Sequence, residues 1–184
     1  MADKFKNKYR ISSARLQSWD YGSNGYYFVT ICTKKRKHFF GEIEGKKMNL
    51  NWLGEVALEC WIEIPEHFNF VELGRYVVMP NHVHGIIIIN KLGNNNIDHI
   101  HPDRFRNQGK NTISSIVGSY KSAVTKLINR KSNSENNKMQ ESFGWQSRFY
   151  DHIMRSESEY IRISEYIEKN PLNWKKDILK NIDQ

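Results

Sequence analysis

The stretch VVMPNHVHGIIII, residues 77–89, decides the fold of this chain. A run this short and this rich in β-branched residues predicts a buried strand. Side chains on a strand alternate between its two faces, so His82 and His84 are expected to point the same way. The proline and asparagine that precede them are typical of a tight turn. We therefore expect a strand over 71–79 that folds back into a histidine strand over 82–89.

The histidine pair has two interpretations. Two imidazoles side by side on a rigid strand supply part of a metal site, because imidazole is a common ligand of divalent cations. Alternatively, His82 and His84 are core residues whose ring nitrogens are satisfied by hydrogen bonds. A bare His-x-His motif does not separate the two interpretations. The choice depends on what the rest of the chain places beside the pair.

The size and composition of the chain indicate a single folded domain over residues 1–184. Of the 184 residues 39% are hydrophobic and 12% aromatic, which is enough for a full core. The net charge of +8 favours a polyanionic partner. Cys32 and Cys60 have no metal-ligand spacing and favour a reducing compartment. With neither a signal peptide nor a membrane-spanning run in the sequence, we expect a cytoplasmic protein without a membrane partner.

Hydrophobic periodicity along the chain predicts four strands and three helices. Pro65 is expected to end the first helix and Pro171 the third, while Ser156 and Glu159 form a capping box at the start of the third. The predicted strands are 26–33, 71–79, 82–89 and 143–154; the predicted helices are 53–64, 112–130 and 156–170; the remaining segments are a basic arm over 1–20, a basic turn over 34–37, a loop or short hairpin over 41–51, polar loops over 91–111 and 132–142, and a tail over 171–184 with room for a short helix.

The order of these elements predicts an α+β fold. It is β-α-β-β-α-β followed by one more helix, which is the split βαβ, ferredoxin-like pattern. We expect an antiparallel sheet with helices on one face and an added C-terminal helix. The first and third strands are central in this topology, so the histidine strand over 82–89 would occupy a stiff position.

The third predicted helix carries the groups that a histidine pair lacks. Ile163, Tyr166, Ile167 and Asn170 follow helical spacing and form one stripe. The two isoleucines should face the sheet, which brings the phenol and the amide toward the histidines as a nucleophile and a third ligand. Imidazole and amide oxygen with open positions suit Mg²⁺ or Mn²⁺. Alternatively, Tyr166 packs in the core and Asn170 caps the helix.

Tyr120 is the main competing tyrosine. It falls on the apolar stripe of the helix predicted over 112–130, so it is expected to pack in the core. Four residues after it stands Val124, which cannot bind a metal, whereas Tyr166 is followed by Asn170 at the same spacing. The spacing therefore favours Tyr166 as the reactive tyrosine.

The motifs together resemble those of the single-tyrosine HUH transposases. MPNHVH (79–84) looks like the His-hydrophobe-His motif of that family, and WQSRFYDH (145–152) with EYIEKNP (165–171) resembles the C-terminal half of its REP-associated branch. Residues 26–36 resemble the first strand of the family. The resemblance covers most of residues 20–174, and the combination of motifs in this order is specific.

The resemblance implies an activity and a site. It implies that His82, His84 and Asn170 hold a divalent cation, Mg²⁺ or Mn²⁺, and that Tyr166 attacks a phosphate of single-stranded DNA. The products are a 5′-phosphotyrosine and a free 3′-hydroxyl, and reversal with another strand end rejoins the DNA. The implied partner is single-stranded DNA, with or without hairpins, and the implied assembly is a monomer or a homodimer.

Further basic residues are candidates for contacts with DNA, although a structural ion pair is an alternative for each. Basic and aromatic side chains suit single-stranded DNA, whose phosphates pair with Lys and Arg and whose bases stack. Two other functions stay open: a metal-dependent nuclease that uses water, and a non-catalytic module that binds single-stranded nucleic acid. A covalent protein–DNA adduct separates them from the transposase. The candidate DNA-binding residues are Arg148, His152, Arg155, Lys34, Lys35, Arg36 and Lys121.

Overall fold

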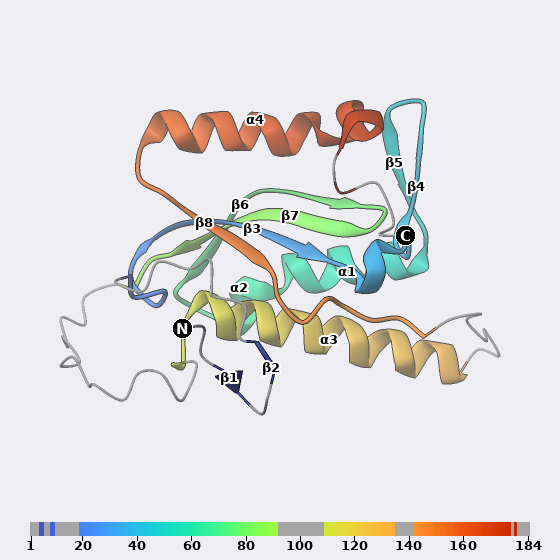
Figure 1. The fold of residues 1–184 in the computed structure, drawn as a ribbon, viewed down its shortest axis with the longest axis horizontal. Coiled ribbons are helices and arrows are strands. Elements are labelled where there is room, and N and C mark those ends of the chain that lie inside the picture. Colours follow the sequence, from blue (N-terminus) through green and yellow to red (C-terminus); the bar gives the residue numbers. More distant parts are fainter. Residues whose placement is uncertain are drawn as a thin grey trace.

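A four-stranded antiparallel sheet forms the centre of the molecule, with helices on both of its faces (Figure 1). The computed structural model describes residues 19–91, 109–134, 142–177 and 179, together with two short strands near the N-terminus. Helix α4 covers one face, and helices α1, α2 and α3 lie on the other. The strands of the sheet are β3 (Gly25–Cys32), β6 (Val71–Met79), β7 (His82–Ile89) and β8 (Tyr150–Met154).

The order of the strands confirms the ferredoxin-like prediction. The sheet reads β6-β7-β3-β8, so the first and third strands in chain order are the central ones. Strand β7 pairs antiparallel with β3, and the register places His82 opposite Cys32 and His84 opposite Thr30. The hairpin predicted from the turn before the histidines is formed by β6 and β7. The histidine strand therefore has a hydrogen-bonded neighbour on each side, which fixes the direction of its side chains.

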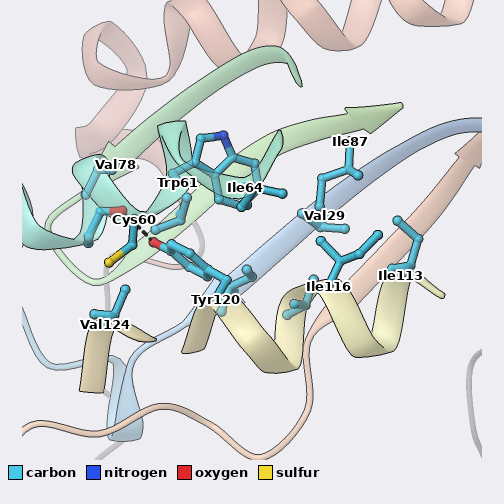
Figure 2. Packing of buried hydrophobic residues seen from close by; sticks show 14 of the residues in the cluster. Val29, Cys60, Trp61, Ile64, Val78, Ile87, Ile113, Ile116, Tyr120 and Val124 are labelled. Carbon is cyan, nitrogen blue, oxygen red and sulfur yellow. Dashed lines mark hydrogen bonds between the residues drawn. The ribbon is translucent and has the colours of Figure 1, made fainter. Parts of the chain in front are cut away.

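The larger part of the core lies between the sheet and the helices α1, α2 and α3 (Figure 2). Tyr120 of α3 is buried there as predicted, and its hydroxyl donates a hydrogen bond of 3.0 Å to the Ala57 carbonyl. The ring of Trp61 packs against β7 at Gly85, where an added Cβ would overlap the indole. Tight packing of this kind stabilises the fold. The three helices are α1 (Trp52–Ile62), α2 (Ile64–His67) and α3 (Ile113–Ser134).

A smaller apolar cluster lies between the sheet and α4 (Glu157–Asn173). The helix begins after Ser156, whose hydroxyl accepts a hydrogen bond from the backbone N–H of Glu159, as the capping box predicts. The two isoleucines of the predicted stripe face the sheet. The members of the cluster are Phe28, Ile86, Met154, Ile163 and Ile167.

Two predictions about prolines were wrong. The first helix ends at Ile62, and Pro65 lies in the first turn of α2, where its missing N–H has no helical partner to lose. Helix α4 continues through Pro171 to Asn173. Its end is held by Trp174, which is buried beyond the helix, and burial of an indole outweighs the loss of one helical hydrogen bond.

The last strand is shorter than the predicted 143–154. Its ladder with β3 begins at Tyr150, and the residues before it follow an irregular path with an isolated bridge between Trp145 and Thr33. Aromatic side chains drive this path, because Phe143 and Trp145 pack against Phe40 in the larger core. The alternation that predicted a strand therefore reflects burial of aromatic rings in a loop.

The remaining segments agree in part with the sequence. Residues 41–51 form the predicted hairpin, and α3 runs past the expected end at 130 into the predicted loop over 132–142. Residues 92–108 of the polar loop, 135–141, 180–184 and most of the basic arm lie outside the described residues. No helix in the described ranges is long and apolar enough to cross a membrane. The other elements are β1 (Lys4–Phe5), β2 (Lys8–Tyr9), η1 (Lys34–Arg36), β4 (Gly41–Glu44), β5 (Lys47–Leu50) and η2 (Trp174–Lys176).

Candidate active site and metal centre

The two histidines lie beside each other on the face of the sheet that α4 covers. Their ring centroids are 4.3 Å apart, and both side chains are almost fully buried. His84 Nδ1 lies 2.9 Å from the hydroxyl of Thr30 on the neighbouring strand. His82 Nδ1 lies 2.8 Å from Oδ1 of Asn81. In each ring one nitrogen is therefore engaged, and the Nε2 atom is left for another role.

Burial keeps both imidazoles neutral near pH 7. Burial lowers the pKa of His84 to about 3. The pKa of His82 lies well below its usual range, chiefly through burial and secondarily through the neighbouring His84. A metal ligand must be the neutral imidazole. The environment of the pair therefore presents the rings in the state that binds a cation.

Tyr166 of α4 faces the same pair. Its hydroxyl oxygen lies 3.3 Å from His84 Nε2, and 46% of the residue remains exposed. Its ring also makes an edge contact with Phe28, at 6.1 Å between centroids. Burial raises the pKa of the phenol, the Asp177 carboxylate raises it further, and a hydrogen bond from the Asn170 side chain opposes them. Tyr166 is thus a protonated phenol at the edge of the site, open to solvent on one side.

Three buried lone-pair atoms on the histidine strand, on α4 and just after it lack a hydrogen-bond partner among the described residues. They are His82 Nε2, Asn170 Oδ1 and Asp177 Oδ2. Each can donate a lone pair, and leaving such an atom unpaired costs about 1–3 kcal/mol. His82 Nε2 and Asp177 Oδ2 are 3.8 Å apart, and the possible ligand atoms of these two residues and His84 all lie within 4.8 Å of one another. The donor set fits a divalent cation.

Asp177 was missed by the sequence analysis. It lies after α4 in the tail, which carries no periodic pattern that would predict its direction. The chain turns back beside the sheet because Trp174 is buried against His82, at 6.1 Å between ring centroids. The signal in the sequence was an acidic residue shortly after the expected end of the helix. The path of the chain that carries Asp177 to the histidines, however, depends on tertiary packing.

A pocket of about 590 Å³ opens beside the phenol of Tyr166. It lies over the surface between β3, β8 and α4 and contains both apolar walls and cationic side chains. Arg36, Arg148 and His152, predicted as DNA contacts, all line it. His152 Nε2 also lies within hydrogen-bond distance of Glu159 Oε1, at 2.6 Å, so it has a structural contact as well. Other lining residues include Phe28, Thr30, His84, Gln146, Tyr150 and Arg162.

The other candidate DNA contacts lie elsewhere. Lys34 and Lys35 line a separate, smaller hollow of about 220 Å³ together with Lys37, Phe39 and Ser142. The ammonium group of Lys121 donates to the carbonyl of Gln146 at 2.8 Å, and burial lowers its pKa. Arg155 lies over the ring of Trp19, at 6.0 Å. Neither of these last two residues is among those that line the large pocket.

Comparisons with known proteins indicate the class of protein to which this chain is similar. Residues 92–170 match the family described as "Transposase IS200 like". An uncharacterized protein of Haemophilus influenzae (strain Rd) is 40% identical over 172 residues, 91% of this chain and 91% of that protein. The structure of the REP-associated tyrosine transposase bound to a REP hairpin covers 95% of this chain and 89% of its own, with a TM-score of 0.57 and 17% identity.

The fold and the site define a ferredoxin-like domain with a histidine pair on a central strand and a tyrosine on the covering helix. The chain belongs to the IS200-like transposase family. The residues matched by the family include Tyr166 and Asn170 and begin after the two histidines. Membership indicates a protein of the DNA transposase kind, and the structure places the histidine pair beside Tyr166.

Proposed function

We propose that this protein cuts and rejoins single-stranded DNA through a covalent bond to Tyr166. The observation that carries the proposal is the placement of the Tyr166 hydroxyl, 3.3 Å from Nε2 of His84. A nucleophile must lie within reach of the phosphate that it attacks. A phenol beside a buried pair of neutral imidazoles would meet that requirement for a phosphate held next to the pair by a cation.

The residues that would hold the cation are His82, His84 and Asn170, with Asp177 as a further donor. Imidazole nitrogens and uncharged or anionic oxygens suit Mg²⁺ or Mn²⁺. Three of these four residues contribute atoms without a hydrogen-bond partner in the described part of the chain. When bound, such a cation polarises the scissile phosphate and stabilises the charge that develops on its oxygens. The amide of Asn170 also holds the phenol, since it hydrogen-bonds Tyr166.

The exchange is balanced in atoms and protons. The phenol oxygen of Tyr166 forms a bond to phosphorus while the bond to the 3′ oxygen breaks, giving a 5′-phosphotyrosine. The phenol loses its proton, and the departing oxygen takes one up to become a free 3′-hydroxyl. In the reverse direction, the 3′-hydroxyl of another strand end attacks the phosphotyrosine and restores Tyr166. One phosphodiester bond is exchanged for another, so rejoining the strands needs no nucleoside triphosphate as an energy source.

The large pocket is suited to the DNA strand that flanks the phosphate. Tyr150 is 56% exposed at the pocket wall, and its ring lies 6.3 Å from that of Phe28. Exposed aromatic rings stack on unpaired bases, and arginine pairs with phosphates. Arg148 and Arg162 supply those cations in the same wall. Single-stranded DNA, with or without a hairpin nearby, is therefore the proposed substrate, and the hairpin-bound relative in fold supports it.

Tyr166 and the histidines belong to one chain, so we propose that one copy can carry out cleavage. A homodimer would not be needed to complete the site, because Tyr166 and His84 of one chain line the same pocket and His82 lies beside His84. Mixing a Tyr166→Phe chain with a His84→Ala chain tests this directly. Restored cleavage in the mixture would show that the tyrosine acts across subunits, whereas an inactive mixture supports action within one chain.

The test of the function is incubation of the protein with a library of single-stranded DNA and Mn²⁺ or Mg²⁺, followed by intact-mass analysis. The proposal predicts a protein–DNA adduct and loss of all cleavage with a chelator, while the folded state survives chelation. Release of both strand ends without an adduct would indicate a nuclease that uses water. Binding without cutting would indicate a non-catalytic module, and unfolding on chelation would indicate a structural metal.

A further inference from the structure

Asn81 occupies the turn before the histidine strand and is completely buried. Its side-chain nitrogen donates one hydrogen bond to the Arg36 carbonyl at 3.0 Å and one to the Leu179 carbonyl at 2.6 Å. Both amide hydrogens are therefore used. The orientation of the amide follows, because two carbonyl oxygens can face the NH₂ group but would repel the amide oxygen.

The fixed amide determines which ring nitrogen of His82 carries the hydrogen. Oδ1 of Asn81 is an acceptor only, and it lies 2.8 Å from Nδ1 of His82. In a neutral imidazole one nitrogen is a donor and the other an acceptor. Nδ1 must therefore hold the hydrogen, which leaves the lone pair on Nε2. That atom is buried without a partner in the described part of the chain and faces Asp177 Oδ2 at 3.8 Å.

His84 provides the contrast. Its Nδ1 lies 2.9 Å from the hydroxyl of Thr30, and a hydroxyl can either donate or accept. Thr30 therefore accommodates either tautomer of His84, whereas Asn81 permits one tautomer of His82. The two ring nitrogens that face the site are thus controlled in different ways, although the motif makes the two histidines look equivalent.

We propose that Asn81 is a positioning residue that locks His82 as the Nδ1–H tautomer and so directs the Nε2 lone pair toward a divalent cation. Partners of this kind in metal sites fix ring orientation, and their loss typically lowers metal affinity about 10–100-fold. The same side chain joins the basic turn and the tail to the histidine strand. The orientation of His82 therefore depends on both neighbouring segments. The inference about the cation rests on the proposed function.

Asn51 offers a matched control for the loss of hydrogen bonds. Its side chain also makes three hydrogen bonds, accepting from the backbone of Leu53 and Gly54 and donating to the carbonyl of Phe39. It caps α1, and its hydrogen-bond partners all lie between residues 39 and 54, away from the histidine strand in sequence. Asn51→Leu and Asn81→Leu thus remove the same number of hydrogen bonds from an asparagine, but only the second removes the acceptor for His82.

The first measurement is the tautomer of His82 in the metal-free wild-type protein. Long-range ¹H–¹⁵N NMR of protein labelled at histidine, with His82→Gln and His84→Gln used to assign the rings, should show Nδ1 protonated and Nε2 unprotonated in His82. Protonation of Nε2 in the folded protein would overturn the proposal. This result needs no variant of Asn81 to fold and no cation, so it is independent of whether the protein cleaves DNA.

The second measurement is the affinity for Mn²⁺, determined by electron paramagnetic resonance. Asn81→Leu should bind Mn²⁺ about 10–100-fold more weakly than wild type, and Asn51→Leu should bind it equally well. Wild-type affinity in a folded Asn81→Leu protein would overturn the positioning role. The wild-type protein could show the predicted tautomer and yet bind no Mn²⁺. That result would refute both the claim that the lone pair serves a cation and the proposed function.

Discussion

Tyr120 and Tyr166 come from helices that cover opposite faces of one sheet. The hydroxyl of Tyr120 is buried and donates to the Ala57 carbonyl, and aliphatic and aromatic side chains surround it. The hydroxyl of Tyr166 lies by His84 at the edge of a pocket. The phenol of Tyr120 forms a structural hydrogen bond in the core, whereas that of Tyr166 lies partly exposed beside a buried imidazole.

The same contrast extends to the polar atoms of the two faces. On the α4 face, lone-pair atoms of His82, Asn170 and Asp177 are buried without a hydrogen-bond partner among the described residues. On the helices of the other face, the Trp61 indole N–H and the Ser132 hydroxyl also lack one within the same ranges. An indole N–H is a donor only and the hydroxyl is a single neutral oxygen, whereas imidazole, amide and carboxylate atoms are ligands that divalent cations favour. The difference fits the proposed function, in which one face of the sheet stabilises the fold and the other gives up stability for a binding site.

The largest expected effect is on cleavage when the histidine pair is broken. His84→Ala removes a proposed ligand and the imidazole that contacts Tyr166, so cleavage should fall by about 10²–10³-fold, a change typical of losing one preorganised charge-stabilising group. Binding of single-stranded DNA should largely survive, because affinity comes from many phosphate contacts. Gel cleavage and fluorescence anisotropy measure the two. Equal loss of binding and cleavage in an unfolded variant would favour core histidines instead.

The next effect concerns stability and belongs to the opposite face. Trp61→Ala leaves a cavity against Gly85 of β7 and should lower the free energy of unfolding by about 3–5 kcal/mol. Urea denaturation followed by circular dichroism measures it. Leu172 of α4, 55% exposed, is the matched site on the other side, and Leu172→Ala should change stability by less than about 0.5 kcal/mol. Similar losses for both variants would contradict the division of roles between the faces.

A smaller effect is expected for DNA affinity at the pocket wall. Arg148→Ala should weaken binding of single-stranded DNA and reduce the slope of log affinity against log salt by about 0.7, the value for one phosphate contact on a single strand. Arg75, an exposed arginine on β6 outside the pocket, is the control, and Arg75→Ala should leave the slope unchanged. An unchanged slope for Arg148→Ala would remove this residue from the DNA path.

A small effect on stability is also expected at a buried polar atom that lacks a hydrogen-bond partner among the described residues. Asn170→Leu replaces an unpartnered buried oxygen by methyl groups of similar volume, so the free energy of unfolding should stay within about 1 kcal/mol of wild type. Cleavage should nevertheless fall strongly, because the amide is a proposed ligand and holds Tyr166. Thermal denaturation and the cleavage assay separate the two readouts. A large loss of stability with cleavage retained would reverse the assignment.

Much of the fold was predictable because local patterns determined it. The alternation around His82 and His84 predicted their shared face, and the strand order followed from the order of elements. The helical stripe predicted that Ile163 and Ile167 would face the sheet and bring Tyr166 and Asn170 with them. In each case neighbours in sequence determine direction, through the strand and helix periods.

The parts that could not be predicted depend on contacts between distant segments. Asp177 reaches the histidines because Trp174 is buried next to the sheet. No periodic pattern in the sequence of the tail predicts the burial of Trp174. Helix α4 continues through Pro171 because of the same burial. Asn81 was read as a turn residue, and its role toward His82 emerges only with the carbonyls of Arg36 and Leu179 in place.

The account is tested most directly by asking which tyrosine becomes attached to DNA. Wild type, Tyr166→Phe and Tyr120→Phe are each incubated with single-stranded DNA and Mn²⁺, and the adduct is digested and mapped by mass spectrometry. We predict an adduct on Tyr166 in wild type and in Tyr120→Phe, and none in Tyr166→Phe, which should keep its fold, metal binding and DNA binding. Strand cleavage by Tyr166→Phe would contradict the account, since the nucleophile would then be water or another residue.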